Sequence, residues 1–163
     1  MPPDPGAVDA ALIARLTDPA LQALMPGGVY FDIGAKGQTA MVIVSVMEDA
    51  ADYMFHGDAT RRTVYQVKAV DLQTSGARVT EAAARIHALL QWDDDGPPPL
   101  VLAEFDLLAL RLVERVRYTE VDTANADQRW QHHGGLYEVL VAPVALAPAH
   151  TTEEDAHGTT TRQ

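Results

Sequence analysis

Apolar residues recur at helical spacing near the start of the chain. Val8, Leu12 and Leu16 recur every fourth residue, and Asp4 followed by Pro5 favours a helix start, because an N-cap oxygen and a proline in the first turn both suit the beginning of a helix. A second start of the same kind follows at 18–19, and the proline and glycines at 26–28 end the segment. These signals predict a broken amino-terminal helix.

The clearest helical segment spans residues 77–91. Its apolar stripe consists of Val79, Ala83, Ile86 and Leu90. Glu81 precedes Arg85 by four residues, a spacing that favours a surface ion pair. We expect this helix to pack across a sheet through its apolar stripe.

Alternating and continuous apolar runs predict four to five strands. They cover residues 29–33, 40–47, 63–70, 107–121 and about 136–141. In the third run Tyr65, Val67 and Ala69 share one face, as a sheet with one polar face requires. Residues 48–62 are acidic and aromatic without a clear period, which predicts a loop or excursion. The fold class is therefore α+β: a mostly antiparallel sheet, one main helix packed across it, and a broken amino-terminal helix.

The run 107–121 carries a row of arginines. Its alternation places leucines such as Leu108 inward and Arg111, Arg115 and Arg117 outward, but Glu114 falls on the apolar side. A bulge or a subunit contact near Glu114 would explain this violation. Three cations on one face need acidic partners, which either a neighbouring strand or a neighbouring subunit could supply. We therefore predict these four charged residues as candidates for a subunit interface.

The composition indicates one domain, with no covalent support. The 163 residues fit a single core, which we place at residues 1–145, while 146–163 form a polar carboxyl-terminal extension too poor in apolar groups to add to it. There is no cysteine, no apolar run long enough to cross a membrane, and no signal-peptide pattern at the start, so we expect neither membrane insertion nor secretion. The net charge of −11 disfavours a DNA-binding surface.

No residue pattern demands catalysis or a cofactor. Asp93 begins an acidic triplet that lacks the alternate ligand spacing of a calcium loop. His132 and His133 are adjacent, so on a strand they would point to opposite faces and could not share one metal; we predict loop or surface histidines. Gly134 and Gly135 match no phosphate-binding motif and suggest a bend or a positive φ before the final strand. We predict no catalytic residue, no metal and no cofactor, and hence not an enzyme.

Several fragments in a fixed order resemble the tail-completion or tail-terminator family of long-tailed phages. They are a split amino-terminal helix, TVYQVKAV, the helix AARIHALL, and VRYTEVD followed by HHGGLYEVLV, over roughly residues 8–141. The residues of this sequence that carry the pattern are Tyr65, Val67, Tyr118, Glu120, Gly135 and Tyr137. The long segment 48–62 and the polar extension depart from the compact pattern of the family.

The resemblance implies a structural virion protein. Such a subunit forms a six-membered ring at the head-proximal end of a finished tail tube, stops tube growth and joins the tail to the head connector. Its implied partners are further copies of itself, the tail tube protein, the connector or stopper protein and the tape measure protein, with assembly in the host cytoplasm and DNA passing through unbound. The alternatives are a head-completion or neck adaptor protein, and a small cytosolic enzyme or ligand-binding domain.

Overall fold

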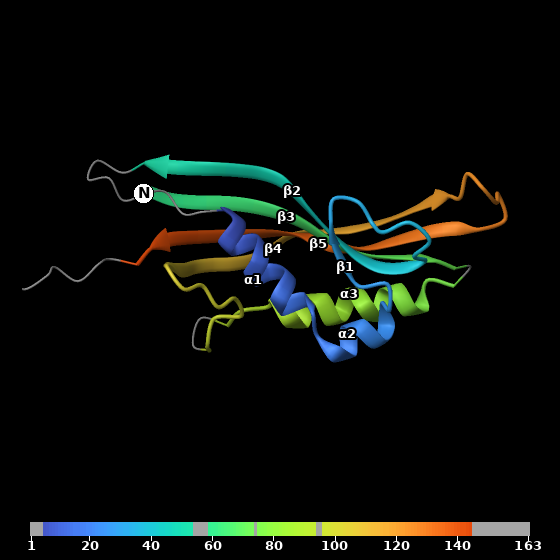
Figure 1. Cartoon of the computed structure of the whole chain (residues 1–163), viewed down its shortest axis with the longest axis horizontal. Helices are drawn as coiled ribbons and strands as arrows, with labels where there is room; N and C mark the ends of the chain where they lie inside the picture. The colour runs from blue at the N-terminus through green and yellow to red at the C-terminus, as the bar shows by residue number, and fades with distance from the viewer. Residues whose placement is uncertain (1–4, 54–58, 74, 94–95, 145–163) are drawn as a thin grey trace, which may run out of the picture.

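The structure, a computed structural model, describes residues 5–53, 59–73, 75–93 and 96–144. Within these residues three helices and five strands follow one another along the chain (Figure 1). They are α1 (Pro5–Leu16), α2 (Pro19–Leu24), β1 (Val29–Phe31), β2 (Ala40–Tyr53), β3 (Ala59–Leu72), α3 (Ala77–Leu90), β4 (Phe105–Val121) and β5 (Arg129–Pro143).

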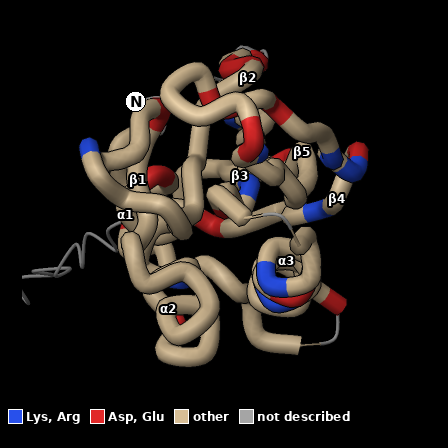
Figure 2. The backbone as a smooth tube through the Cα atoms, turned by 90° about the vertical axis from the view of Figure 1, so that its right-hand side faces the viewer, with Lys and Arg blue, Asp and Glu red and all other residues tan. Residues whose placement is uncertain are grey.

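The five strands form one sheet in the order β1-β2-β3-β5-β4. The short β1 runs parallel to β2, and every other neighbouring pair is antiparallel. Figure 2, which looks along the molecule from one end, shows α2 and α3 beneath the strands. The predicted α+β class, the mostly antiparallel sheet and the single main helix are confirmed.

The amino-terminal helix is broken at Asp18, as predicted. The Asp18 carboxylate accepts a hydrogen bond from the backbone N–H of Leu21 at 2.9 Å and so caps α2. The guanidinium of Arg85 on α3 donates to the same carboxylate at 2.9 and 2.7 Å. The predicted pair between Glu81 and Arg85 is therefore wrong: Arg85 is bound by the helix cap across the interface between α2 and α3.

The core lies between the helices and one face of the sheet. On α3 the buried residues include Val79, Ile86 and Leu90 of the predicted stripe, with Ala82 and Leu89 in place of the half-buried Ala83. They pack with apolar residues of α1 and with the sheet residues Tyr65, Val67, Ala69, Tyr137, Val139 and Val141. The hydroxyl of Tyr65 donates to Asp9 of α1 at 2.6 Å, so its one polar atom is satisfied.

The prediction of a loop over residues 48–62 is wrong, because β2 continues to Tyr53 and β3 begins at Ala59. The two strands extend as a ribbon whose charges pair across it: Asp49 accepts from Arg61, and Glu48 pairs with Arg62. Residues 54–58 lie outside the described part. Cross-strand ion pairs replace the apolar alternation by which a strand is recognised in sequence.

The alternation along β4 is interrupted by two bulges. Leu107 and Ala109 pair with consecutive residues of β5, and so do Leu112 and Glu114, so Leu108 and Val113 are extra residues without a partner in the register. The predicted bulge near Glu114 is confirmed. The predicted burial of Leu108 is wrong, because the first bulge turns its side chain outward and leaves it 48% exposed.

The glycine pair lies inside β5 rather than before it, and neither glycine has a positive φ. A Cβ at Gly134 would lie 2.0 Å from the carbonyl oxygen of Val67, and one at Gly135 would lie 2.4 Å from Leu112. The close approach of β3 to Gly134 and of β4 to Gly135 therefore explains these glycines. The predicted positive φ is wrong, and so is the predicted position before the final strand.

Three expectations concern other parts of the chain. The carboxyl-terminal extension 146–163 and two of the three aspartates at 93–95 lie outside the described residues. Among the residues that are described, no helix is long and apolar enough to cross a membrane.

Candidate functional site

The bulge at Val113 divides the predicted arginine row between the two faces of the sheet. Arg111 lies opposite Glu138, whereas Arg115 and Arg117 lie opposite Gly135 and His133. Residues directly opposite each other in an antiparallel pair share a face, and one extra residue shifts the alternation by one position. The prediction that the three arginines share an outward face is therefore wrong.

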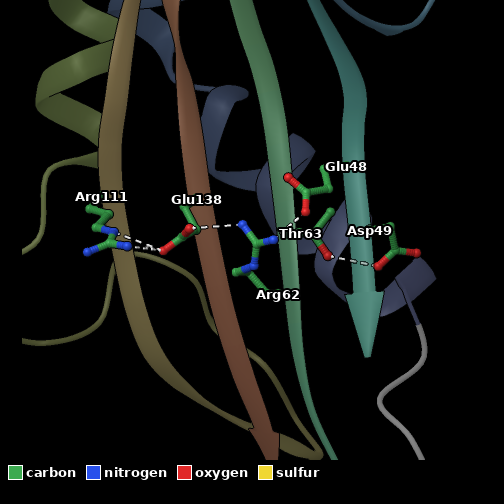
Figure 3. A network of polar contacts seen from close by, with 6 residues as sticks. All are labelled: Glu48, Asp49, Arg62, Thr63, Arg111 and Glu138. Carbon is green, nitrogen blue, oxygen red and sulfur yellow. Dashed lines mark hydrogen bonds and ion pairs between the residues drawn. The ribbon is translucent and has the colours of Figure 1, made fainter. Parts of the chain in front are cut away.

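Arg111 belongs to a charge ladder that crosses four strands on the face away from the helices. Its guanidinium donates to Glu138 of β5, with nitrogen-to-oxygen distances of 2.8 and 2.7 Å. Glu138 also lies 3.3 Å from Arg62 of β3, which in turn pairs with Glu48 of β2. Figure 3 shows the ladder, which we define as Arg111, Glu138, Arg62 and Glu48.

The signs in the ladder alternate from one edge of the sheet to the other. Its central carboxylate, Glu138, is only 12% exposed, and it is held by two guanidinium groups. The end groups are open to solvent, with 70% of the Arg111 side chain and 52% of the Glu48 side chain exposed. An acidic partner for the arginines was expected from either a neighbouring strand or a neighbouring subunit. For Arg111 a neighbouring strand of the same chain supplies one, the carboxylate of Glu138. The exposed side of Arg111 remains available to a second acidic group.

Arg115 and Arg117 line a groove on the helix-bearing face. The groove encloses about 250 Å³ between α3 and the two carboxyl-terminal strands, and its polar lining includes Thr80, His87 and His133. Neither arginine has an ion pair with any described residue. Glu114 is exposed on the other face beside Arg111. The four candidate interface residues thus form two separate groups.

The Thr80 hydroxyl in the groove is not activated by the neighbouring histidine. The Thr80 hydroxyl lies 2.7 Å from the carbonyl oxygen of Gly76, to which it donates its only proton, and 3.0 Å from Nδ1 of His133. It therefore accepts from the ring instead of giving the ring a proton. Burial, together with the nearby charge of Arg117, lowers the pKa of His133, so the ring is neutral at pH 7.

His132 and His133 point to opposite faces of β5, as predicted for a strand. Both are buried, however, so the prediction of loop or surface histidines is wrong. The ring of His132 stacks on Tyr118 with centroids 4.3 Å apart, and its Nε2 lies 3.4 Å from a carboxylate oxygen of Glu120. Burial lowers the pKa of His132, and the positive charge of Lys68 adds to the effect. The period-two alternation that ends in Tyr137 and Val139 continues back through Gly135 to His133. Following it further back in the sequence would have predicted a longer strand with His133 buried.

The residues of the family pattern form two groups. Tyr65 pairs in register with Tyr137, and Val67 with Gly135, so these four form the centre of the helix-covered core. Tyr118 and Glu120 lie on the other face beside His132, where the Tyr118 hydroxyl accepts from Lys68 at 2.7 Å. Neither group resembles a reaction centre. Within the described residues no three metal-binding side chains come together, and the absence of a metal or catalytic activity remains a prediction.

Comparison with known proteins gives a structural match. A solved structure described as the virion of a native gene transfer agent (GTA) particle contains a chain with a TM-score of 0.59 and 23% sequence identity. The alignment covers 84% of this chain and 96% of that chain. This fold occurs in a virion.

A second solved chain, which carries no functional name, gives a TM-score of 0.50 at 21% identity, with 88% of this chain and 98% of that chain covered. No family model and no curated protein matches the sequence. At these identities the comparisons establish a shared fold.

Proposed function

We propose that this protein is a structural virion subunit that forms a hexameric ring at the head-proximal end of a phage tail tube. In this role it ends tube growth and joins the tail to the head connector. The observation that carries the proposal is the shared fold: the alignment with the chain of the gene transfer agent virion spans 96% of that chain. The order of the family fragments along this sequence agrees with it.

The edges of the sheet support an assembling role. The long strand β4 forms one edge, and at the other edge β1 pairs with residues 42–44, so residues 45–53 of β2 have no strand partner on that side among the described residues. Long unpaired edges are surfaces to which another strand can add. Large apolar side chains are exposed along both edges, among them Met47 at 57% and Val113 at 56%. Such surfaces are expected of a subunit that is completed by neighbours.

The charge of the chain fits a ring through which DNA passes. Its 23 acidic residues against 12 basic ones give a net charge of −11. A surface of this sign repels phosphate, so a genome would pass such a ring without being held. The partners in this proposal are further copies of the chain, the tail tube protein, the connector or stopper protein and the tape measure protein.

Tube length tests the role. The tail tube and tape measure proteins would be produced together with or without this chain, and the tubes measured by electron microscopy. We expect tubes of one length when the chain is present and overgrown tubes when it is left out. Tubes of uniform length in both cases would contradict the role. If this protein is found on heads that lack tails, the result would favour the alternative role of a head-completion or neck adaptor protein.

A further inference from the structure

The two ends of the charge ladder lie on one row across the sheet. Arg111 is opposite Glu138, Glu138 is opposite Val64, and Val64 is opposite Glu48. The row therefore begins with an exposed cation on the β4 edge and ends with an exposed anion on the β2 edge. Both groups lie on the same face of the sheet and carry opposite charge.

Each bulge of the described sheet places a large apolar side chain beside one of these ends. The extra residues are Met47 in β2 and Leu108 and Val113 in β4, and they are 57%, 48% and 56% exposed. Met47 is next to Glu48, while Leu108 and Val113 lie on either side of Arg111 along the strand. A bulge commonly turns an edge strand away from pairing, but here it also exposes an apolar group next to a charge.

The strand directions allow one copy to continue the sheet of another. Each neighbouring pair from β2 through β3 and β5 to β4 is antiparallel, so β4 runs opposite to β2. A second copy placed beside the first in the same orientation would bring its β2 next to β4 in an antiparallel arrangement. Contacts of this head-to-tail kind close into a ring when the rotation between copies allows.

We propose that the β4 edge of one copy docks against the β2 edge of the next, with Arg111 facing Glu48 of the next copy. Leu108 and Val113 then cover the apolar surface around Met47 of that copy. This inference rests on the proposed ring and names the surfaces that form it. A second copy is the occupant because the two edges match each other in charge, in row and in apolar flanks.

Charge reversal tests the contact. Arg111→Glu places two carboxylates at every interface, and Glu48→Arg places two guanidinium groups there, so each variant alone should associate at least about tenfold more weakly than the wild type in sedimentation. In an equal mixture the two variants can alternate around a ring. Every interface then joins one carboxylate to one guanidinium group, either as in the wild type or with the two charges exchanged. We therefore expect the mixture to recover association to within about threefold of the wild type.

Matched controls separate this contact from a change in net charge. Lys36→Glu and Glu81→Arg make the same charge changes at exposed positions outside the two proposed contact surfaces and should leave association unchanged. Thermal melting checks that each variant is folded. If Arg111→Glu does not fold, Arg111→Gln takes its place; it removes the charge without adding repulsion and should weaken association by a smaller factor.

Three results would overturn the inference: a wild-type chain that stays monomeric, reversals that leave association unchanged, or a mixture that stays dissociated. If a ring on tails assembles equally well from the wild type and from the charge-reversal variants, this contact is rejected and the proposed function is not. Tubes of uniform length made without this chain would reject the proposed function, whether or not the β4 and β2 edges associate.

Discussion

The two faces of the sheet use different chemistry. On the helix-covered face, Tyr65, Tyr137 and Ile86 are at most 2% exposed and belong to a single apolar core. On the other face, charged residues cross the strands in a ladder whose ends are open to solvent. Burial of apolar area is the main source of folding free energy, whereas exposed ion pairs contribute little. The first face therefore contributes most of the apolar burial that stabilises the fold, whereas the ladder on the second face leaves charged groups open to solvent.

Ile86→Ala should give the largest loss of stability. The side chain is fully buried on α3, so its truncation leaves a cavity and should lower the free energy of unfolding by about 2 to 5 kcal/mol in urea titration. Leu108→Ala is the control on the exposed bulge. A loss below about 0.5 kcal/mol for Ile86→Ala would show that α3 does not pack on the sheet as described.

Gly134→Ala tests the close approach of β5 and β3. The new Cβ would overlap the Val67 carbonyl oxygen and the Lys68 Cα, which are backbone atoms, so we expect a loss of about 1 to 3 kcal/mol. Gly96→Ala is the control, because its Cβ would have no described neighbour closer than 3.4 Å. Equal stability of both variants would contradict the strand spacing.

Acid should reveal the Asp18 cap. The hydrogen bonds from Arg85, and then from the Leu21 backbone, lower the pKa of Asp18 from 3.8 to about 2. A lowered carboxyl pKa stabilises the fold fully above the unfolded value, and this contribution is lost as the pH falls from about 4 to about 2. Asp18→Asn keeps a capping oxygen without the charge, so its stability should depend less on pH in this window. Identical pH profiles for the two proteins would contradict the pairing.

Arg111→Ala should have the smallest effect on folding. The side chain is 70% exposed and Glu138 keeps Arg62 as a partner, so the loss should be below about 1 kcal/mol. A loss of about 2 kcal/mol or more in urea titration would show that the ladder stabilises the single chain, and the contrast between the two faces would then be smaller than we describe.

Much of the helix-covered face could be predicted from sequence, because its signals are local. Tyr65, Val67 and Ala69 alternate at the strand period, and Val79 with Ile86 follow the helical period. These periods survive because one face of each element is buried in the same core. The broken helix was also predictable, since a capping aspartate and a proline act on the residues directly after them.

The other face could not be predicted, because its partners are distant in the chain. Glu48 of β2 pairs with Arg62 of β3, and Arg111 of β4 pairs with Glu138 of β5, so these partners meet only once the strands have paired. A bulge adds one residue and reverses every later side chain, which moved Arg115 and Arg117 to the helix-bearing face. The misplaced Glu114 was the one local sign of this change.

The most direct test of the central claim is cryo-electron microscopy of intact particles. We expect density for this chain as a ring of six copies between the head connector and the last ring of the tail tube, with β4 of each copy beside β2 of the next. Absence of the chain from that position, or any other number of copies in the ring, would contradict the account.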